Sequence, residues 1–487
     1  MIKKVNIRFI LKLLGFTCIF ETSFLIVALL VSLGYGGDDV LPFVYTALIM
    51  LCFGGSCFAI GYGAKKQKVG RREGMLLVTL IWFFFSVVGM LPFVFGGYLP
   101  TVADAFFETM SGFTTTGATV FKTVEQLPHG ILFWRSIIQW QGGIGIIVFT
   151  MALLPVITGD AGATSIYNAE TTGIMHDRFL PRISAVAKRI ALVYLALTTL
   201  LVIFLWVGPM NLFDSICHAF TCTATGGYST KNAGIGYYHS SYVEYIISIF
   251  MILCGTNMTL TYFCMIGKPG QLFKDEEFRW FILILFFFVA VTTLYLWFHH
   301  FFDTFEGSFR AALFQIGSMM TSTGYLTQDI TSWGPFFWVI SLVVMFIGGS
   351  SGSTSGGFKV SRILVISKNL HNEFKKRSHP NAIVPVRANG IVIPSGLVSQ
   401  VLAFFFAYLA VSFAAVFFLT LDGVGFKESI SSCISCIGNC GPGLGTLTFD
   451  CASLSSMSKL ILCAVMLIGR LEIFTVLCLF SPAFWRN

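Results

Sequence analysis

The sequence predicts an all-α polytopic membrane protein. Hydrophobic residues make up 55% of its 487 residues, charged residues only 11%, and the mean hydropathy is +0.81. A membrane-spanning helix needs about 20 mostly apolar residues, and the chain offers about ten runs of that kind. A membrane β-barrel would show short alternating segments instead. We therefore expect about ten transmembrane helices and no soluble domain.

The first two apolar runs, roughly 13–33 and 40–62, form an accessory unit that we place at residues 1–70. The first run does not resemble a cleavable signal peptide, because Glu21 interrupts it and no small-residue processing site follows. Neither run is followed by the loop motif that marks the rest of the chain. We expect these residues to form a hairpin of two transmembrane helices.

The rest of the chain contains four divergent copies of one unit. Each copy has a long apolar run, a shorter semi-apolar segment, a loop of small residues around a glycine, and a second long run. The units occupy residues 71–160, 180–268, 276–372 and 396–487. The second runs include 131–156, 245–266 and 460–480. Aligning the loops pairs Gly117 with three glycines that follow at intervals of 109, 98 and 117 residues, namely Gly226, Gly324 and Gly441.

A segment too short to cross the membrane, followed by a glycine loop, predicts a re-entrant pore helix. Non-helical backbone is tolerated at membrane depth only where protein buries it or water lines it. Four such loops in pseudo-fourfold arrangement can present backbone carbonyls that replace the hydration shell of a monovalent cation. Glycine suits the turn, Ser and Thr add hydroxyls without bulk, and no loop carries the Lys or Arg that an anion site would need. The alternative is a set of ordinary glycine-mediated helix contacts.

The expected ion-binding residues are the three at the centre of each loop, and we expect a metal ion at no other residues. They are Thr115, Thr116, Gly117, Ala224, Thr225, Gly226, Ser322, Thr323, Gly324, Asn439, Cys440 and Gly441. Cys433 and Cys436 form a C-x-x-C, but no second pair or nearby His completes a metal site.

The distribution of Lys and Arg predicts the orientation. Basic residues gather in 3–8, 65–72, 178–189 and 368–387, which all fall on one side of the expected topology. Acidic residues such as Asp104 and Asp422 fall on the other side. The positive-inside rule then places both termini in the cytoplasm and lets the four loops enter from outside. The net charge of +8 thus reflects membrane topology and not nucleic-acid binding.

The third unit has a last apolar run, Trp333 to Ile347, of only 15 residues. Such a helix rises about 22 Å, short of the hydrocarbon core of about 30 Å. The break that follows should lie inside the membrane and could block the path below the loops and move aside. It consists of Gly348, Gly349, Ser350, Ser351, Gly352, Ser353, Thr354, Ser355, Gly356 and Gly357. The alternative is a flexible linker at the membrane surface.

A serine enzyme is a remote alternative for this break, since residues 348–352 match G-x-S-x-G. A nucleophile elbow needs a preceding strand and a partnered His, and the sequence indicates neither. We expect no enzymatic activity.

Arg470 lies near the middle of the last apolar run. An intramembrane charge is costly and is by default functional, with a partner. Glu472 is two residues away and so faces another side of the helix, which makes it an unsuitable partner. An Arg that only bonds backbone carbonyls is the alternative.

The fourfold repeat resembles the Trk/Ktr/HKT superfamily of potassium transporters, and the two extra N-terminal runs resemble its bacterial TrkH/TrkG branch. Residues 139–145 (QWQGGIG), 439–445 (NCGPGLG) and 469–472 (GRLE) resemble that branch too. The resemblance implies potassium selectivity with one glycine of each loop at the filter. It also implies that residues 348–357 form the gate and that Arg470 lies below the filter against it, as an electrostatic barrier to cations. We therefore expect neutralisation of Arg470 to raise cation flux. Sodium-preferring relatives carry Ser in the first loop, where this chain has Gly117.

The resemblance further implies a multi-pass protein of the bacterial inner membrane that forms a homodimer. It implies a separate cytosolic TrkA-type nucleotide-binding ring, so that nucleotide binds only that subunit and this chain binds no cofactor besides its substrate, potassium. The basic stretch 368–387 is the expected docking surface, with an ordinary positive-inside loop as the alternative. Sodium, ammonium or proton-coupled cation transport by the same fold also stays open.

Overall fold

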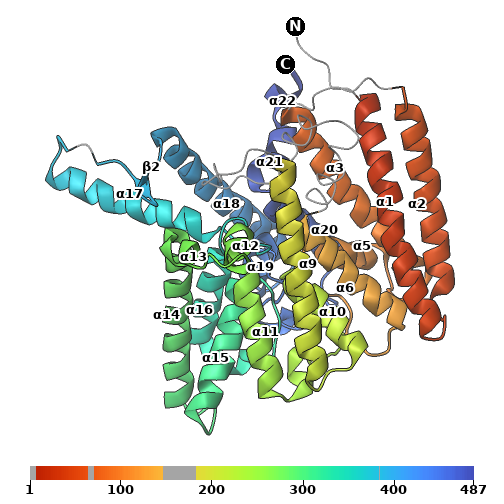
Figure 1. Cartoon of the computed structure of the whole chain (residues 1–487), viewed down its shortest axis with the longest axis horizontal. Coiled ribbons are helices and arrows are strands. Elements are labelled where there is room, and N and C mark those ends of the chain that lie inside the picture. The colour runs from red at the N-terminus through yellow and green to blue at the C-terminus, as the bar shows by residue number, and fades with distance from the viewer. Residues whose placement is uncertain (1–6, 64–70, 146–182, 383, 487) are drawn as a thin grey trace.

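The computed structural model describes residues 7–63, 71–145, 183–382 and 384–486 (Figure 1). Seven of its helices are long and apolar enough to cross a membrane, or up to nine if each of two bent helix pairs counts as one span. The expected span 131–156 leaves the described part of the chain after Gly145. The prediction of an all-α polytopic membrane protein is confirmed. The described residues also form one antiparallel β-hairpin with two residues in each strand.

The N-terminal hairpin consists of α1 (Ile7–Gly34) and α2 (Val40–Gly61), which pack along their lengths at one flank of the molecule (Figure 1). Glycines allow this close approach: a Cβ atom at Gly15 would lie 2.5 Å from the backbone nitrogen of Phe58. Small residues at helix contacts are typical of membrane proteins. The other face of α1 packs against α6 (His129–Ile144) of the first repeat.

Each of the four repeats has a long first helix, a short helix that leads into a loop, and a further helix of 14 to 16 residues after the loop. Repeat one contains α3 (Arg71–Gly89), α4 (Leu91–Phe95), α5 (Val102–Phe113) and α6. Repeat two contains α9 (Ile183–Val207), α10 (Leu212–Thr223), η1 (Gly234–Tyr238), α11 (Ser241–Cys254), α12 (Met258–Met265) and α13 (Gly270–Lys274). Repeat three contains α14 (Glu276–Phe298), α15 (Phe305–Met320), η2 (Ile330–Trp333), α16 (Gly334–Ile347) and α17 (Val360–Ser378). The hairpin of β1 (Arg387–Ala388) and β2 (Ile391–Val392) lies between repeats three and four. Repeat four contains α18 (Ser395–Leu421), α19 (Phe426–Ile437), η3 (Gly445–Leu447), α20 (Ser456–Arg470), α21 (Ile473–Leu477), η4 (Cys478–Phe480) and α22 (Pro482–Arg486).

The short helices α5, α10, α15 and α19 have 12, 12, 16 and 12 residues. A helix of 12 residues rises about 18 Å, so it enters the membrane without crossing it. Three of the four begin at a side-chain cap: Thr101, Asn211 and Thr304 each accept a hydrogen bond from the backbone nitrogen three residues later. Such caps satisfy amides that the first helical turn leaves unpaired.

The second long helix of a repeat is broken in more than one repeat, which corrects the expectation that only repeat three has a break. α11 and α12 meet at 110°, and α20 meets the segment from α21 to η4 at 113°. The expected continuous spans 245–266 and 460–480 are therefore wrong. Glycine favours the expected break of repeat three, because Gly348 follows α16 with a φ of +73°.

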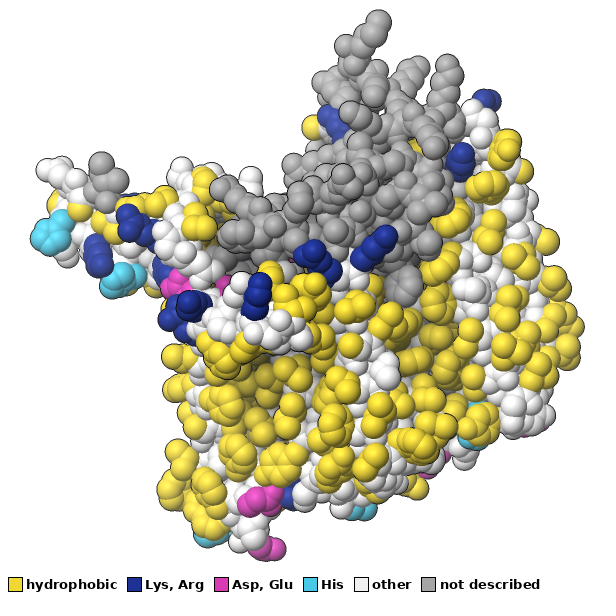
Figure 2. Space-filling view, viewed as in Figure 1, with side chains coloured by type: hydrophobic (Ala, Val, Ile, Leu, Met, Phe, Trp, Pro, Cys, Tyr) yellow, Lys and Arg dark blue, Asp and Glu magenta, His cyan; other side chains and the backbone are white. Residues whose placement is uncertain are grey.

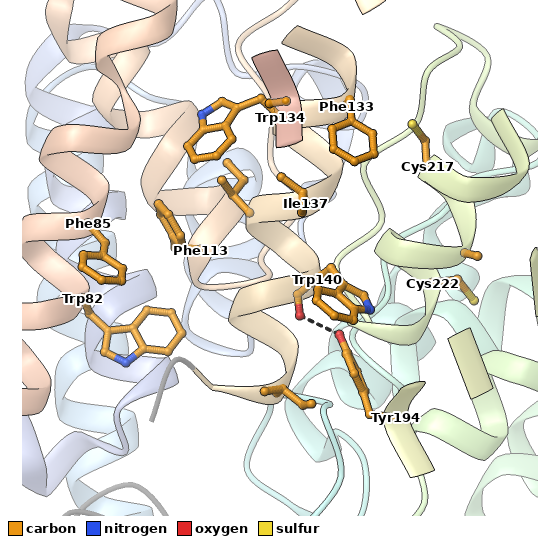
Figure 3. Packing of buried hydrophobic residues seen from close by; sticks show 14 of the residues in the cluster. Trp82, Phe85, Phe113, Phe133, Trp134, Ile137, Trp140, Tyr194, Cys217 and Cys222 are labelled. Carbon is orange, nitrogen blue, oxygen red and sulfur yellow. Dashed lines mark hydrogen bonds between the residues drawn. The ribbon is translucent and has the colours of Figure 1, made fainter. Parts of the chain in front are cut away.

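Aromatic packing fixes α6 between repeats one and two (Figure 3). Trp134 donates to the carbonyl of Gly89 at 3.0 Å. Trp140 lies against Tyr194 of α9, whose hydroxyl donates to the Trp140 carbonyl at 2.8 Å. Since buried aromatic side chains that also satisfy their polar atoms specify a unique packing, α6 is held firmly beside the central loops.

The surface separates into an apolar middle and two polar ends (Figure 2). Hydrophobic side chains cover the middle, Lys and Arg gather at the end where both termini lie, and Asp and Glu are visible at the opposite end. Helix α17 projects away from the helical body at the terminal end (Figure 1). Basic clusters are expected at 3–8, 65–72 and 178–189, and of these residues 3–6, 65–70 and 178–182 lie outside the described part of the chain.

Candidate functional site

Four loops with the same backbone conformation follow the four short helices; we call residues 114–118, 224–228, 321–325 and 438–442 the central loops. The second residue of each has a positive φ between 51° and 53°, although none of them is a glycine: Thr115, Thr225, Ser322 and Asn439. The next backbone nitrogen donates at 2.8 Å to the carbonyl five residues earlier in every loop, as Thr116 does to Ser111. These shared features align the four loops residue by residue.

This structural alignment corrects one expected residue. The fourth residue of each loop is a glycine with a positive φ of 82°, 76°, 79° and 103°, namely Gly117, Gly227, Gly324 and Gly441. Gly226, which the sequence alignment paired with Gly117, instead matches Thr116. The adjacent pair Gly226 and Gly227 caused the error, because either glycine fits the short motif. The same shift applies to Ala224, which was paired with Thr115 and instead matches Thr114. Ala224 and Thr114 are each the C-cap of their short helix.

The four glycines close a ring in which each loop touches the next. A Cβ atom would lie 2.0 Å from the carbonyl oxygen of the following loop at three of them: Gly117 faces Gly226, Gly227 faces Thr323, and Gly324 faces Cys440. Gly441 completes the ring, with 2.5 Å to the carbonyl oxygen of Thr116. The contacts run from repeat one through four and back to one, so the loops surround a single axis. No side chain fits at these positions without moving backbone.

Side chains from neighbouring repeats hold the loops in place. The amide of Gln139 donates to the Gly226 carbonyl at 2.8 Å and accepts from the Tyr228 nitrogen at 3.1 Å. The hydroxyl of Tyr228 donates to the Glu108 carbonyl in α5 at 2.7 Å. Tyr325 makes the equivalent contact one repeat later, to the His218 carbonyl in α10 at 3.1 Å. Each tyrosine thus links its own central loop to the short helix of the preceding repeat.

A buried ion pair lies behind the first central loop. Arg135 of α6 and Glu108 of α5 approach within 2.8 Å, and their side chains are 2% and 0% exposed. The other Glu108 oxygen accepts from the Val120 nitrogen at 2.9 Å, and Arg135 donates to the Ser229 carbonyl at 3.2 Å. The guanidinium also lies 4.2 Å from the ring centre of Tyr228. The pair therefore connects loops one and two.

The chemistry of the ring suits a monovalent cation. The central loops contain no charged side chain and contribute backbone carbonyls, hydroxyls and one amide. Two buried oxygens at the second loop position, Thr115 Oγ1 and Asn439 Oδ1, have no hydrogen-bond partner in the described part of the chain. Carbonyl and hydroxyl oxygens without fixed carboxylates are typical of potassium sites, whereas divalent cations favour carboxylates. Among described residues no cluster of His, Cys, Asp or Glu could hold a metal ion, and Cys433 and Cys436 are free thiols.

Residues 348–357, which we call the glycine–serine loop, form a closed loop beneath the ring. Its two ends are joined by three backbone hydrogen bonds, from Phe358 to Phe346, Lys359 to Ile347, and Val360 to Gly349, of 2.9 to 3.0 Å. Two glycines meet at this neck, where a Cβ atom at Gly357 would lie 2.5 Å from the α-carbon of Gly348. The residues between are therefore held as one compact unit.

The glycine–serine loop contacts repeats two, three and four, at the C-terminal ends of α10 and α11 and at two of the central loops. Thr354 donates to the carbonyls of Thr223 and Cys254 at 3.2 and 3.3 Å. The Gly356 nitrogen donates to the Ser322 hydroxyl at 2.6 Å. A Cβ atom at Gly356 would also lie 2.1 Å from the Gly438 carbonyl oxygen.

Arg470 attaches the glycine–serine loop to repeat one. It is the last residue of α20 and so lies at the break in the last span, not within a continuous helix. Its guanidinium donates to the Thr354 carbonyl at 3.0 Å and to the Gly143 carbonyl at 3.3 Å. Glu472 pairs with Arg362 at 2.5 Å. Through Arg470, all four repeats contact the loop or the group that holds it.

The sequence did not reveal several of these supporting residues. Glu108, Arg135, Glu277, Arg362 and Glu472 are charged side chains at or beside the central loops and the glycine–serine loop. An isolated charge in an apolar run is the signal that a sequence offers for such residues, and Arg470 carries it most plainly. Their pairing could not be read from the sequence because the partners come from different repeats.

A membrane protein of four repeats whose re-entrant loops surround one axis has the architecture of ion-conducting proteins. The family described as "TrkH: Cation transport protein" matches residues 43–487, and the chain belongs to this family.

The chain is similar along its whole length to named members of that family. It is 38% identical over 486 residues to the Trk system potassium uptake protein TrkH of Salmonella typhimurium, covering 99% of this chain and 100% of that protein. It is 33% identical over 489 residues to TrkG of Escherichia coli K12, covering 99% of each chain. The crystal structure of the potassium transporter TrkH from Vibrio parahaemolyticus matches with a TM-score of 0.88 and 35% identity, covering 99% of this chain and 100% of that one.

Proposed function

We propose that this chain takes up potassium ions through a pore along the axis of the central loops. The observation that carries the proposal is the closed ring of four glycines, each packed on a carbonyl of the next loop. The potassium uptake proteins to which the chain is 38% identical support the same ion. The chain acts as a transporter and not as an enzyme.

The central loops act as the selectivity filter. A dehydrated potassium ion exchanges its water oxygens for loop oxygens, and the packed ring keeps those oxygens at a spacing that a smaller sodium ion fits poorly. The filter residues are Thr115, Thr116, Gly117, Thr225, Gly226, Gly227, Ser322, Thr323, Gly324, Asn439, Cys440 and Gly441, with Ala224 at the helix end. The residues that follow the glycines differ between the loops: they are Ala118, Tyr228, Tyr325 and Pro442. The four loops therefore share only one layer of glycines, and the filter is short.

The glycine–serine loop acts as the gate. Its contacts with Thr223, Ser322 and Gly438, at the C-terminal ends of three short helices, support this role, because a loop there obstructs an axial path. The hydrogen bonds that hold its neck favour movement of the loop as a unit. Arg470 adds a positive charge beside the gate and opposes the passage of a cation until the gate moves.

The chain lies in the bacterial inner membrane. The end of the molecule where α1 begins and α22 lies faces the cytoplasm, because Lys and Arg gather there (Figure 2). Both termini are therefore cytoplasmic. It acts as a homodimer with a cytosolic TrkA-type nucleotide-binding ring. The docking surface is the outer part of the 368–387 stretch, where Lys375 and Arg377 are exposed. Lys368 is already engaged by Glu276 and the Arg387 carbonyl.

Rubidium uptake into liposomes that contain the purified chain tests the function. Rubidium replaces potassium closely in size, so potassium should compete and sodium, ammonium or a proton gradient should have little effect. Equal competition by sodium or ammonium would support a less selective cation transporter, and uptake that requires a proton gradient would support a symporter. Uptake by a Ser350→Ala/Ser351→Ala variant would exclude a role for a serine nucleophile.

A further inference from the structure

A buried ion pair lies where α17 leaves the gate. Arg362 belongs to the first turn of α17, and its guanidinium contacts Glu472 at 2.5 Å. The two side chains are 6% and 17% exposed. Arg362 also donates to the Phe358 carbonyl at 2.9 Å and stacks 3.9 Å from the ring centre of Phe404. Phe358 and Phe404 therefore fix the arginine on two sides, and the Glu472 carboxylate holds the third.

The pair joins two strained points of the backbone. Glu472 has φ of +61° at the break in the last span, and Lys359 has φ of +83° at the exit from the glycine–serine loop. Non-glycine residues adopt such angles only when their surroundings hold them there. Since Arg470 contacts Thr354 within the loop, the short segment 470–472 holds both the loop and its exit. Loss of the contact between Glu472 and Arg362 would leave the contact between Arg470 and Thr354 as the attachment from this segment.

Helix α17 extends from this point into the region expected to meet a regulatory partner. Its first turn is buried, including Val360 and Leu364, whereas Leu370 and Phe374 are 55% and 63% exposed. The outer part projects away from the body (Figure 1). A contact between Lys368 and Glu276 of α14 steadies its middle. Because a helix moves as a rigid rod over this length, displacement of its outer part shifts Arg362.

We propose that the Arg362–Glu472 ion pair is a latch that couples the position of α17 to the gate. With the pair intact, the exit of the glycine–serine loop is fixed and the loop stays beneath the central loops. Displacement of α17 pulls Arg362 from Glu472 and releases the loop. Both are positioning residues, since neither lies in the central loops. This inference rests on the proposed function and adds the route by which a partner on α17 regulates transport.

The test measures rubidium flux into liposomes for Glu472→Gln, Arg362→Gln and the double variant. Coupling between two sites typically changes an equilibrium between about fivefold and about 150-fold, and each single variant should raise flux within that range. The double variant should raise flux no further, because both substitutions remove the same interaction. Glu244→Gln is the matched control: it removes an ion pair with Arg310 of 2.8 Å at the start of α11, and flux should not change.

Two further variants test the lever and protect against misfolding. Lys368→Met frees the middle of α17 from Glu276, so it should raise flux in the parent chain and add nothing to Glu472→Gln. If Glu472→Gln does not fold, Arg362→Lys tests the latch instead. Lysine keeps the positive charge but cannot bond both the Phe358 carbonyl and Glu472 with one planar group. Raised flux in Arg362→Lys supports the latch, and unchanged flux contradicts it.

The failure of the latch is distinguishable from failure of the proposed function. Unchanged flux in both single variants, or a double variant whose effect multiplies theirs, would overturn the latch while the parent chain still transports rubidium. Absence of rubidium flux in the parent chain, in Arg470→Gln and in every latch variant would overturn the proposed function itself.

Discussion

The α-carbon of Gly227 faces the carbonyl oxygen of Thr323 so closely that a Cβ atom would lie 2.0 Å from that oxygen. The same relationship joins each central loop to the next and closes the ring. Glycine is needed at these positions for two reasons, the positive φ and the contact with neighbouring backbone. The selectivity of the proposed filter therefore depends on four residues that have no side chain.

We predict that Gly227→Ala abolishes potassium-selective flux, because the new methyl group must displace the backbone of repeat three. Gly317→Ala is the matched control, since a Cβ atom at this helical glycine of α15 would meet no atom within 4 Å. Rubidium uptake should be lost in the first variant and retained in the second. Retained potassium-selective uptake by Gly227→Ala would contradict the role of the glycine ring.

Neutralising Arg470 should raise cation flux. The Arg470→Gln variant removes a positive charge beside the glycine–serine loop and weakens the hydrogen bond to the Thr354 carbonyl. Removal of a charge about 4 Å from a passing cation at an effective dielectric of 20 is worth about 4 kcal/mol before screening. Rubidium flux measures the effect, with the exposed Arg279→Gln as control. Unchanged or abolished flux in a well-expressed Arg470→Gln protein would contradict the barrier.

The Glu108–Arg135 pair should contribute to stability. Glu108→Ala leaves the Arg135 charge buried without its partner, which typically costs about 3 to 5 kcal/mol. Lys376→Ala removes an exposed pair with Glu373 and should change the unfolding free energy by about 0 to 1 kcal/mol. Thermal unfolding of the detergent-purified proteins compares the two. Equal midpoints would show that the buried pair is dispensable.

The tyrosines behind the filter should sharpen ion selectivity. Tyr228→Phe removes the hydroxyl that donates to the Glu108 carbonyl at 2.7 Å, a bond worth about 1 kcal/mol. A looser second loop should lower the preference for potassium over sodium. Tyr325→Phe should act in the same direction, and the exposed Tyr237→Phe should not. The ratio of potassium to sodium permeability measures this preference. Equal ratios in all three variants would show that Tyr228 and Tyr325 do not affect selectivity.

Much of the fold could be predicted from the sequence, because apolar runs of membrane length and a repeated glycine loop are local patterns. A helix too short to cross the membrane is expected in each repeat, and Val102–Phe113 and Leu212–Thr223 are two of the observed ones. The bend between α11 and α12 was missed. A continuous apolar run carries no signal of a break at Gly255, and packing against Thr321 becomes visible only in three dimensions.

The site could be predicted in its residue types and less well in its register and support. A Gly-Gly pair left two alignments open, and shared backbone angles selected Gly227. The pairing of Arg362 with Glu472 spans 110 residues, so no spacing rule could identify it. Arg470 was found because a lone charge in a membrane span is conspicuous, although its contact with Gly143 needed the structure.

The reversal potential of the purified chain in a planar bilayer, with potassium on one side and sodium on the other, tests the central claim most directly. The ring of four glycines should place this potential close to the potassium equilibrium potential, and Gly227→Ala should move it toward zero or remove the current. A parent chain with a reversal potential near zero, or displaced toward sodium, would contradict a potassium filter made by the central loops.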